Sequence, residues 1–156
     1  MGGPQSPRDA KNLPYLQEEI NFLRSSIKAD RYVLGFCLGA QLISEALGGK
    51  TLKSPQKEVD IFPVQLTYEG IQNRLFQDFS AHFLVIHWHN DMPPWTEGAT
   101  LLATSEGCPA QAYQYRIVSM GYSFIWKLPE KVLKNCFEMF LKIYLSAPIR
   151  KRKNNF

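Results

Sequence analysis

The sequence has few cysteines, the residues that form disulfide bonds in small domains and ligate structural zinc ions. Its 156 residues include only three cysteines, with no CxxC pair and no cysteine–histidine pair at zinc-ligand spacing: Cys37, Cys108 and Cys136. An odd, widely spaced set of cysteines argues against a disulfide framework or a structural zinc site. We therefore expect a reducing, cytoplasmic environment, with no metal and no other cofactor.

Long apolar runs are also missing, and so is a basic patch that carries base-stacking aromatic residues. No apolar run approaches the roughly 18–20 residues that span a bilayer, and the N-terminus lacks the pattern of a signal peptide. The net charge of +4 comes from the last part of the chain, where eight basic and two acidic residues follow from Lys127 onward. Without a basic patch carrying base-stacking aromatics, we expect no nucleic-acid partner and no membrane partner. The segment 150–156, which begins with four basic residues, is interpreted as a solvated tail.

The hydrophobic pattern that is present predicts one α/β domain over residues 1–149. Apolar side chains spaced by four, three and four residues predict a helix over 14–29, and they are Leu16, Ile20, Leu23 and Ile27. Further helical segments are expected at 38–47, 71–79 and 130–145. Strands of a mixed sheet are expected at 31–37, 51–53, 61–67, 83–88, 100–104, 110–115 and 117–124.

The junction between the first strand and the second helix carries the most specific motif. It reads Gly35-Phe36-Cys37-Leu38-Gly39, which is typical of a nucleophile on a sharp strand-to-helix turn, with glycines relieving the crowding. The helix would direct its N-terminal amides at the sulfur, which favours the thiolate and an oxyanion. The alternative is a buried structural cysteine beside a tight turn.

The wider context resembles one family. Residues 33–49 resemble the nucleophile segment of the class I glutamine amidotransferases, and most closely the stand-alone, GMP-synthase-type subgroup. Three further groups of segments follow the family order: Gly2-Gly3-Pro4; Lys57-Glu58-Val59 with Phe62-Pro63-Val64; and His87-Trp88-His89-Asn90-Asp91 with Pro94 to Gly98, Leu101 to Ser105, Cys108-Pro109 and Gln111-Ala112. The resemblance covers residues 1 to about 145.

The resemblance implies a fold, a reaction and a set of site residues. The fold would be a three-layer α/β sandwich with a mostly parallel, flavodoxin-like central sheet. The reaction would be hydrolysis of the glutamine side-chain amide through a thioester on Cys37, with ammonia passed to an acceptor. The backbone N–H of Leu38, with one from Gly2 or Gly3, would form the oxyanion hole. Substrate contacts would come from Gln41 and from the His89, Asn90 and Asp91 loop.

The sequence departs from the family at the catalytic base. The family motif Gly-x-Gln-Phe-His-x-Glu corresponds here to residues 121–127, with Ile125 in place of the histidine and Lys127 in place of the glutamate. No histidine follows His89. Because the thiol needs a base, we expect impaired or absent glutaminase activity. The alternatives are a binding or regulatory module with a glutamine-like pocket, and an active amidohydrolase in which His87 or His89 serves as an unconventional base, His89 being better placed at the strand end.

Two more departures bear on function. Asp60-Ile61 stands where the family has Gly-Trp, and a carboxylate there would repel the carboxylate of the substrate. Gly2-Gly3-Pro4 directly follows Met1, whereas the family has an apolar strand and a strand–helix–strand region before it. We therefore expect an N-terminally truncated domain that lacks roughly 40–50 residues of a usual ~200-residue domain. An exposed sheet edge would follow, covered by a synthase partner or by self-association.

Overall fold

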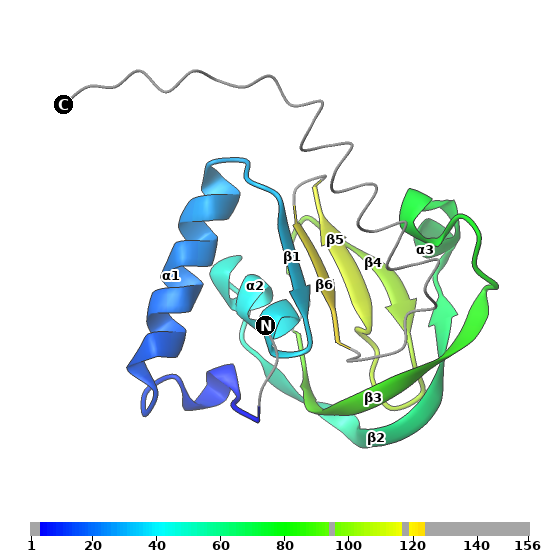
Figure 1. The fold of residues 1–156 in the computed structure, drawn as a ribbon, viewed down its shortest axis with the longest axis horizontal. Coiled ribbons are helices and arrows are strands. Elements are labelled where there is room, and N and C mark those ends of the chain that lie inside the picture. Colours follow the sequence, from blue (N-terminus) through cyan, green and yellow to red (C-terminus); the bar gives the residue numbers. More distant parts are fainter. Residues whose placement is uncertain (1–3, 94–95, 117–118, 124–156) are drawn as a thin grey trace.

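The computed structural model describes residues 4–93, 96–116 and 119–123. They form a curled six-stranded sheet flanked by helices (Figure 1). The strands are β1 (Val33–Phe36), β2 (Leu52–Leu66), β3 (His82–Met92), β4 (Ala99–Thr104), β5 (Ala112–Tyr115) and β6 (Ser119–Tyr122). The helices are α1 (Pro14–Lys28), α2 (Leu38–Ala46) and α3 (Tyr68–Gln72), with short 3-10 turns at Pro7–Asp9 and Arg74–Phe76. The predicted α/β class is confirmed.

The sheet has the order β1-β6-β5-β4-β2-β3. Among the described strands, β1 and β6 pair in parallel, and the other four pairings are antiparallel. The expectation of a mostly parallel sheet is therefore wrong for the described part. Short connections join β4 to β5 and β5 to β6, and such connections suit antiparallel neighbours, whereas parallel neighbours need a long crossover. The crossover from β1 contains α2.

Helix α1 forms where the sequence predicts it. Pro14 lies at the helix start, where its missing N–H costs no hydrogen bond. All four apolar residues of the predicted stripe are buried: Leu16, Ile20, Leu23 and Ile27. They pack with the buried residues of α2 and with Tyr113 of β5 into one apolar cluster. Helices α1 and α2 thus cover one face of the sheet.

A second apolar cluster lies on the opposite face of the sheet. Neighbouring residues of β5 contribute to different clusters, Ala112 to this one and Tyr113 to the first, as the alternation of a strand requires. The second cluster includes Leu75 and Phe76, which follow α3. The predicted helical segment at 71–79 is thus realised as the end of α3 and a 3-10 turn.

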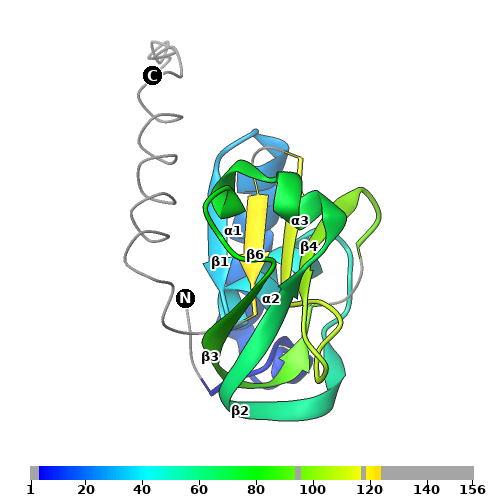
Figure 2. The same ribbon diagram turned by 90° about the vertical axis from the view of Figure 1, so that its right-hand side faces the viewer.

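Strands β2 and β3 form a long curved antiparallel pair that sweeps past the ends of the other strands (Figures 1 and 2). The sequence predicted two strands, at 51–53 and 61–67, where the structure has one, because β3 pairs along its length and a register shift between Lys53 and Glu58 absorbs the mismatch. The loop predicted at His89, Asn90 and Asp91 is also wrong, since these residues belong to β3.

Several sequence-based predictions lie outside the described residues. These are the oxyanion residues Gly2 and Gly3, the helix at 130–145, the boundary between the domain and its basic tail at 149–150, and positions 125 and 127. In the described part of the chain, no helix has the length and apolar character needed to cross a membrane.

Candidate active site around Cys37

Cys37 lies on a strained turn between β1 and α2. Its backbone has φ 50° and ψ −115°, and the left-handed region is costly for a residue with a side chain. Its N–H donates to the carbonyl of Tyr122 at 2.7 Å, while its carbonyl accepts from the N–H groups of Ala40 and Gln41 at 3.0 and 3.3 Å. The turn is therefore held from both sides, by β6 and by the first turn of α2, as a nucleophile elbow requires.

The glycines of the motif allow α2 to approach the sheet. A Cβ on Gly35 would lie 2.5 Å from the backbone carbon and oxygen of Gly39. On the neighbouring strand β6, Gly121 likewise allows a close approach, since a Cβ there would lie 2.4 Å from the Tyr113 ring. The Tyr113 hydroxyl donates to the carbonyl of Ala40 at 2.6 Å, so the aromatic residue that occupies this space also anchors α2.

A cavity of about 290 Å³ opens beside Cys37. That volume is close to the lower end of the usual range for small-ligand pockets, about 300–1,000 Å³. The predicted site residues Cys37, Leu38, Gln41, His89, Asn90 and Asp91 all line it. The structure thus brings together every predicted site residue that it describes. The sequence did not predict the other lining residues, which are Pro4, Gln5, Ser6, Lys57, Val59 and Trp88.

Asp91 joins three segments at the cavity wall. Its carboxylate accepts from the Ser6 hydroxyl at 2.5 Å and pairs with the Arg8 guanidinium at 3.3 Å. The Gln41 side-chain amide donates to its backbone carbonyl at 3.3 Å. The segment that directly follows Gly2-Gly3 is therefore held against the end of β3 and the first turn of α2. Asp60, in contrast, is exposed and is not among the lining residues.

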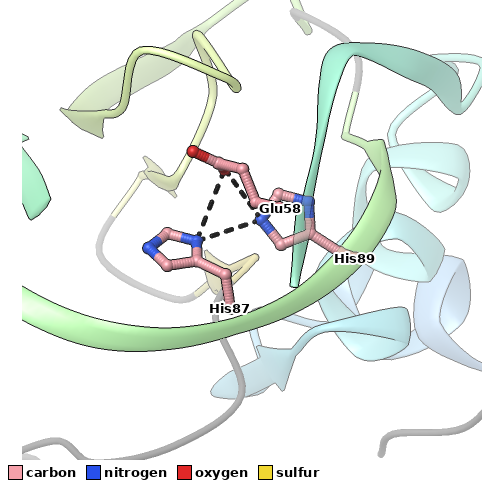
Figure 3. Close-up of side chains that lie close together, drawn as sticks. All are labelled: Glu58, His87 and His89. Carbon is pink, nitrogen blue, oxygen red and sulfur yellow. Dashed lines mark hydrogen bonds and ion pairs between the residues drawn. The ribbon is translucent and has the colours of Figure 1, made fainter. Parts of the chain in front are cut away.

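Behind the cavity lies a buried polar cluster on the inner side of the β2–β3 pair (Figure 3). Glu58 on β2 pairs in register with His89 on β3, and His87 lies two residues earlier on the same face. The Gln111 amide nitrogen lies 2.6 Å from Glu58 Oε2, 3.1 Å from His87 Nδ1 and 3.2 Å from His89 Nε2. The sequence assigned no role to Glu58 or Gln111, and considered His87 only as an alternative base beside His89. Alternation in the His87-x-His89 stretch is the signal that could have placed both rings on one face.

Burial affects the protonation of the two histidines. Loss of hydration lowers the pKa of both His87 and His89, and the Glu58 carboxylate opposes this by raising the pKa of each. The glutamate and the two histidines each offer one atom that could hold a metal ion, and these atoms lie within 4.8 Å of one another. Since the His89 ring is turned toward Glu58, the pocket histidine is already engaged by the cluster.

The second described cysteine has a different environment. Cys108 is fully buried, and burial raises the pKa of its thiol to about 11. It therefore stays protonated at neutral pH and is a poor nucleophile. Cys37 is the described cysteine that borders the cavity.

A comparison with protein families agrees with this geometry. Residues 1–116 match the model of the family described as glutamine amidotransferase class-I. The chain belongs to the class I glutamine amidotransferase family.

Individual proteins are also similar to this chain. A glutamine amidotransferase-like protein of Salmonella typhimurium, YfeJ, is 47% identical over 125 residues, which are 78% of this chain and 52% of that protein. One of the subunits of the glutamine-hydrolysing GMP synthase of Thermococcus kodakarensis is 33% identical over 87 residues, 53% of this chain and 43% of that protein. The chain thus spans about half the length of the curated relatives that it matches.

The fold is shared with solved structures as well. A glutamine amidotransferase of Thermotoga maritima superposes with a TM-score of 0.73 at 23% identity, covering 95% of this chain and 63% of that chain. At this identity the likeness concerns the fold alone. It confirms the predicted class I amidotransferase architecture, with the strand directions corrected as described above.

Proposed function

We propose that this chain binds glutamine with its side-chain amide beside Cys37 and hydrolyses that amide slowly or not at all. One observation carries the proposal. A cysteine on a strained elbow at a helix N-terminus borders a small cavity, and the histidine among the described lining residues, His89, is already paired with Glu58. The elbow supplies a nucleophile and backbone N–H donors. The general base needed for turnover is missing from the sequence after His89.

The charges around the cavity suit an α-amino acid. Lys57 offers a cation and Asp91 an anion within the same lining, which would complement the α-carboxylate and α-ammonium groups of glutamine. Gln41, on the first turn of α2, is held by the backbone of Asp91 and faces the same space. We assign substrate contacts to Gln41, Lys57, Asn90 and Asp91, and the oxyanion donors to Leu38 and the Gly2-Gly3 segment.

The missing base separates binding from turnover. Ile125 and Lys127 occupy the positions of the family's histidine and glutamate. His89 lies 3.3 Å from Glu58 Oε2 and 3.2 Å from His87 Nδ1, so using it as a base for Cys37 would require leaving these partners. We expect the cytoplasm as compartment, because a nucleophilic thiol must stay reduced.

Alkylation with a chloroketone analogue of glutamine tests this function. We expect one adduct per chain, located on Cys37 by peptide mass spectrometry, with the labelling rate lowered at least about tenfold by millimolar glutamine. Cys37→Ala should abolish the adduct, whereas the matched change Cys108→Ser should leave it, because the Cys108 thiol is buried and protonated.

Two outcomes would refute the proposal. Labelling that glutamine does not slow would mean that the cavity does not recognise glutamine. Labelling that persists at the same rate in Cys37→Ala would place the reactive thiol elsewhere.

A protein partner is the second part of the proposal. The outer face of the β2–β3 pair carries an apolar strip of cross-strand neighbours, namely Val59, Ile61, Pro63, Leu84, Ile86 and Trp88. Ile61, Leu84 and Trp88 are 56%, 64% and 67% exposed, and exposed apolar patches mark interaction sites. Because Val59 and Trp88 also line the cavity, a synthase partner seated on the strip would receive ammonia released there. The name of the Thermococcus relative, which is one subunit of a synthase, supports this partner class.

The isolated chain should self-associate through this strip. We expect light scattering after size exclusion to show masses that rise with concentration, and the double change Ile61→Lys, Leu84→Lys to restore a monomer. Phe22→Lys is the matched control, since Phe22 is an exposed apolar residue of α1 outside the strip. A wild-type chain that stays a monodisperse, cooperatively melting monomer at all concentrations would contradict the prediction.

A further inference from the structure

The buried cluster behind the cavity has the geometry of a metal centre. Glu58, His87 and His89 come from two neighbouring strands and converge on one point (Figure 3). They are 3%, 0% and 5% exposed. Buried charged and polar groups are retained when they are paired with one another or when they coordinate a metal.

The distances fit a tetrahedral ion. Glu58 Oε2 lies 3.4 Å from His87 Nδ1 and 3.3 Å from His89 Nε2, and the two ring nitrogens are 3.2 Å apart. The three atoms therefore form a nearly equilateral triangle. Four ligand atoms placed tetrahedrally about 2.0–2.1 Å from a zinc ion are separated by about 3.3–3.4 Å, so the triangle matches one face of such a tetrahedron.

Gln111 occupies the position of the fourth ligand. Its amide nitrogen, which carries two hydrogens, lies within hydrogen-bond distance of four polar atoms: Glu58 Oε2, His87 Nδ1, His89 Nε2 and Ser105 Oγ. Its Oε1 is buried and has no hydrogen-bond partner within the described residues. Turning the amide by 180° would place Oε1 at the fourth vertex and would satisfy this atom.

Outer contacts orient the glutamate ligand. Glu58 Oε1 accepts from the Ser105 hydroxyl at 2.7 Å, which leaves Oε2 to face the histidines. The same hydroxyl oxygen accepts from the N–H of Cys108 at 3.0 Å. Such contacts to the carboxylate fix its orientation and raise metal affinity.

We propose that Glu58, His87, His89 and Gln111 bind one divalent transition-metal ion, with zinc as the best match to two imidazoles and two oxygens. The ion would tie β2, β3 and the segment before β5 together beneath the cavity wall that His89 forms. The site stands apart from the reaction assigned to Cys37. This proposal differs from the sequence-based expectation of no metal. That expectation rested on cysteine-containing spacings, whereas the ligands here are two strand histidines opposite a distant glutamate.

Metal titration of the full chain tests the site. After treatment with a chelator and dialysis, we expect one equivalent of Zn²⁺ or Co²⁺ to bind, the Co²⁺ form to show the intense visible absorption of tetrahedral coordination, and the melting temperature to rise. Glu58→Gln and His87→Gln should lower the affinity more than about 100-fold. Ser105→Ala should lower it by about 10–100-fold.

Matched variants make each outcome decisive. His82→Gln changes the exposed histidine of the same strand and should keep one full equivalent, as should Cys37→Ser. Absence of stoichiometric binding at micromolar metal would overturn the proposal. Wild-type affinity in Glu58→Gln would also overturn it. Because this change is nearly isosteric, it keeps the test valid even if the histidine variants misfold. Loss of the metal in Cys37→Ser would equally overturn it, since the thiol would then be the ligand.

Discussion

The double change Ile125→His, Lys127→Glu is expected to raise the release of ammonia from glutamine by at least about 10³-fold. Removing one member of a catalytic triad typically leaves about 10⁻⁴ to 10⁻⁶ of the original rate, so restoring the base and its orienting carboxylate should recover a large part of that loss. A coupled assay for glutamate, with single-turnover analysis of the thioester, measures the effect.

The geometry at the end of β6 supports this expectation. The Cys37 N–H donates to the Tyr122 carbonyl at 2.7 Å, and Phe36 and Tyr122 are register partners in the parallel pair β1–β6. Position 125 lies three residues further, within at most about 10–11 Å of chain. A histidine at position 125 would follow a strand end that is hydrogen-bonded to the backbone of Cys37.

Single changes provide the control for this experiment. Lys127→Glu alone should leave the rate at baseline, because a carboxylate has no imidazole to orient, and Cys37→Ala in the double variant should remove the gain. If the double variant stays at baseline while Cys37 still reacts with the chloroketone, the absent base is not the cause of low turnover.

Gly35→Ala is expected to destabilise the fold by about 3 kcal/mol or more, since the added Cβ would lie 2.5 Å from the Gly39 backbone and 2.7 Å from the Ile43 side chain. The Gly39 backbone cannot yield easily, because it lies at the start of α2 and cannot move without moving Cys37, and overpacking of this kind is among the mechanisms that give large losses. Urea unfolding followed by circular dichroism measures the loss. The remaining folded protein should react poorly with the glutamine chloroketone.

Gly48→Ala is the matched control for this change. Gly48 has φ 98°, but a Cβ there meets no atom within 4 Å, so the change introduces backbone strain of about 1–2 kcal/mol without a clash. Equal losses in the two variants would show that close packing at Gly35 does not position the elbow. Unchanged labelling of Cys37 in Gly35→Ala would lead to the same conclusion.

The features that sequence could predict are local. The apolar spacing of α1 and the strand–Cys37–helix turn each depend on neighbouring residues, and both appear in the structure as predicted. The continuity of β2 could not be predicted, because Pro55 and Pro63 lie inside it and prolines usually argue against a strand interior. Its pairing with β3 and the register shift override that local signal.

Only part of the site could be predicted, because only some of its residues belong to local motifs. Resemblance supplied Cys37, Gln41 and Asp91, which the structure gathers around one cavity. The buried cluster joins Glu58 to Gln111 across 53 positions of the chain, so it depends on sheet order and register, which composition and periodicity do not encode. Lys57 was missed as a lining residue because its role depends on which side of the β2–β3 pair faces the cavity.

The most direct test of the account is the rate of ammonia release from glutamine by the wild-type chain, measured against Cys37→Ala. The proposed function combines a competent nucleophile with a missing base, so the predicted rate is below about 10⁻³ s⁻¹, given a typical enzymatic kcat of about 10 s⁻¹ and the loss expected without a triad member. Cys37-dependent release at about 1 s⁻¹ or faster would contradict this and would require another residue to act as the base.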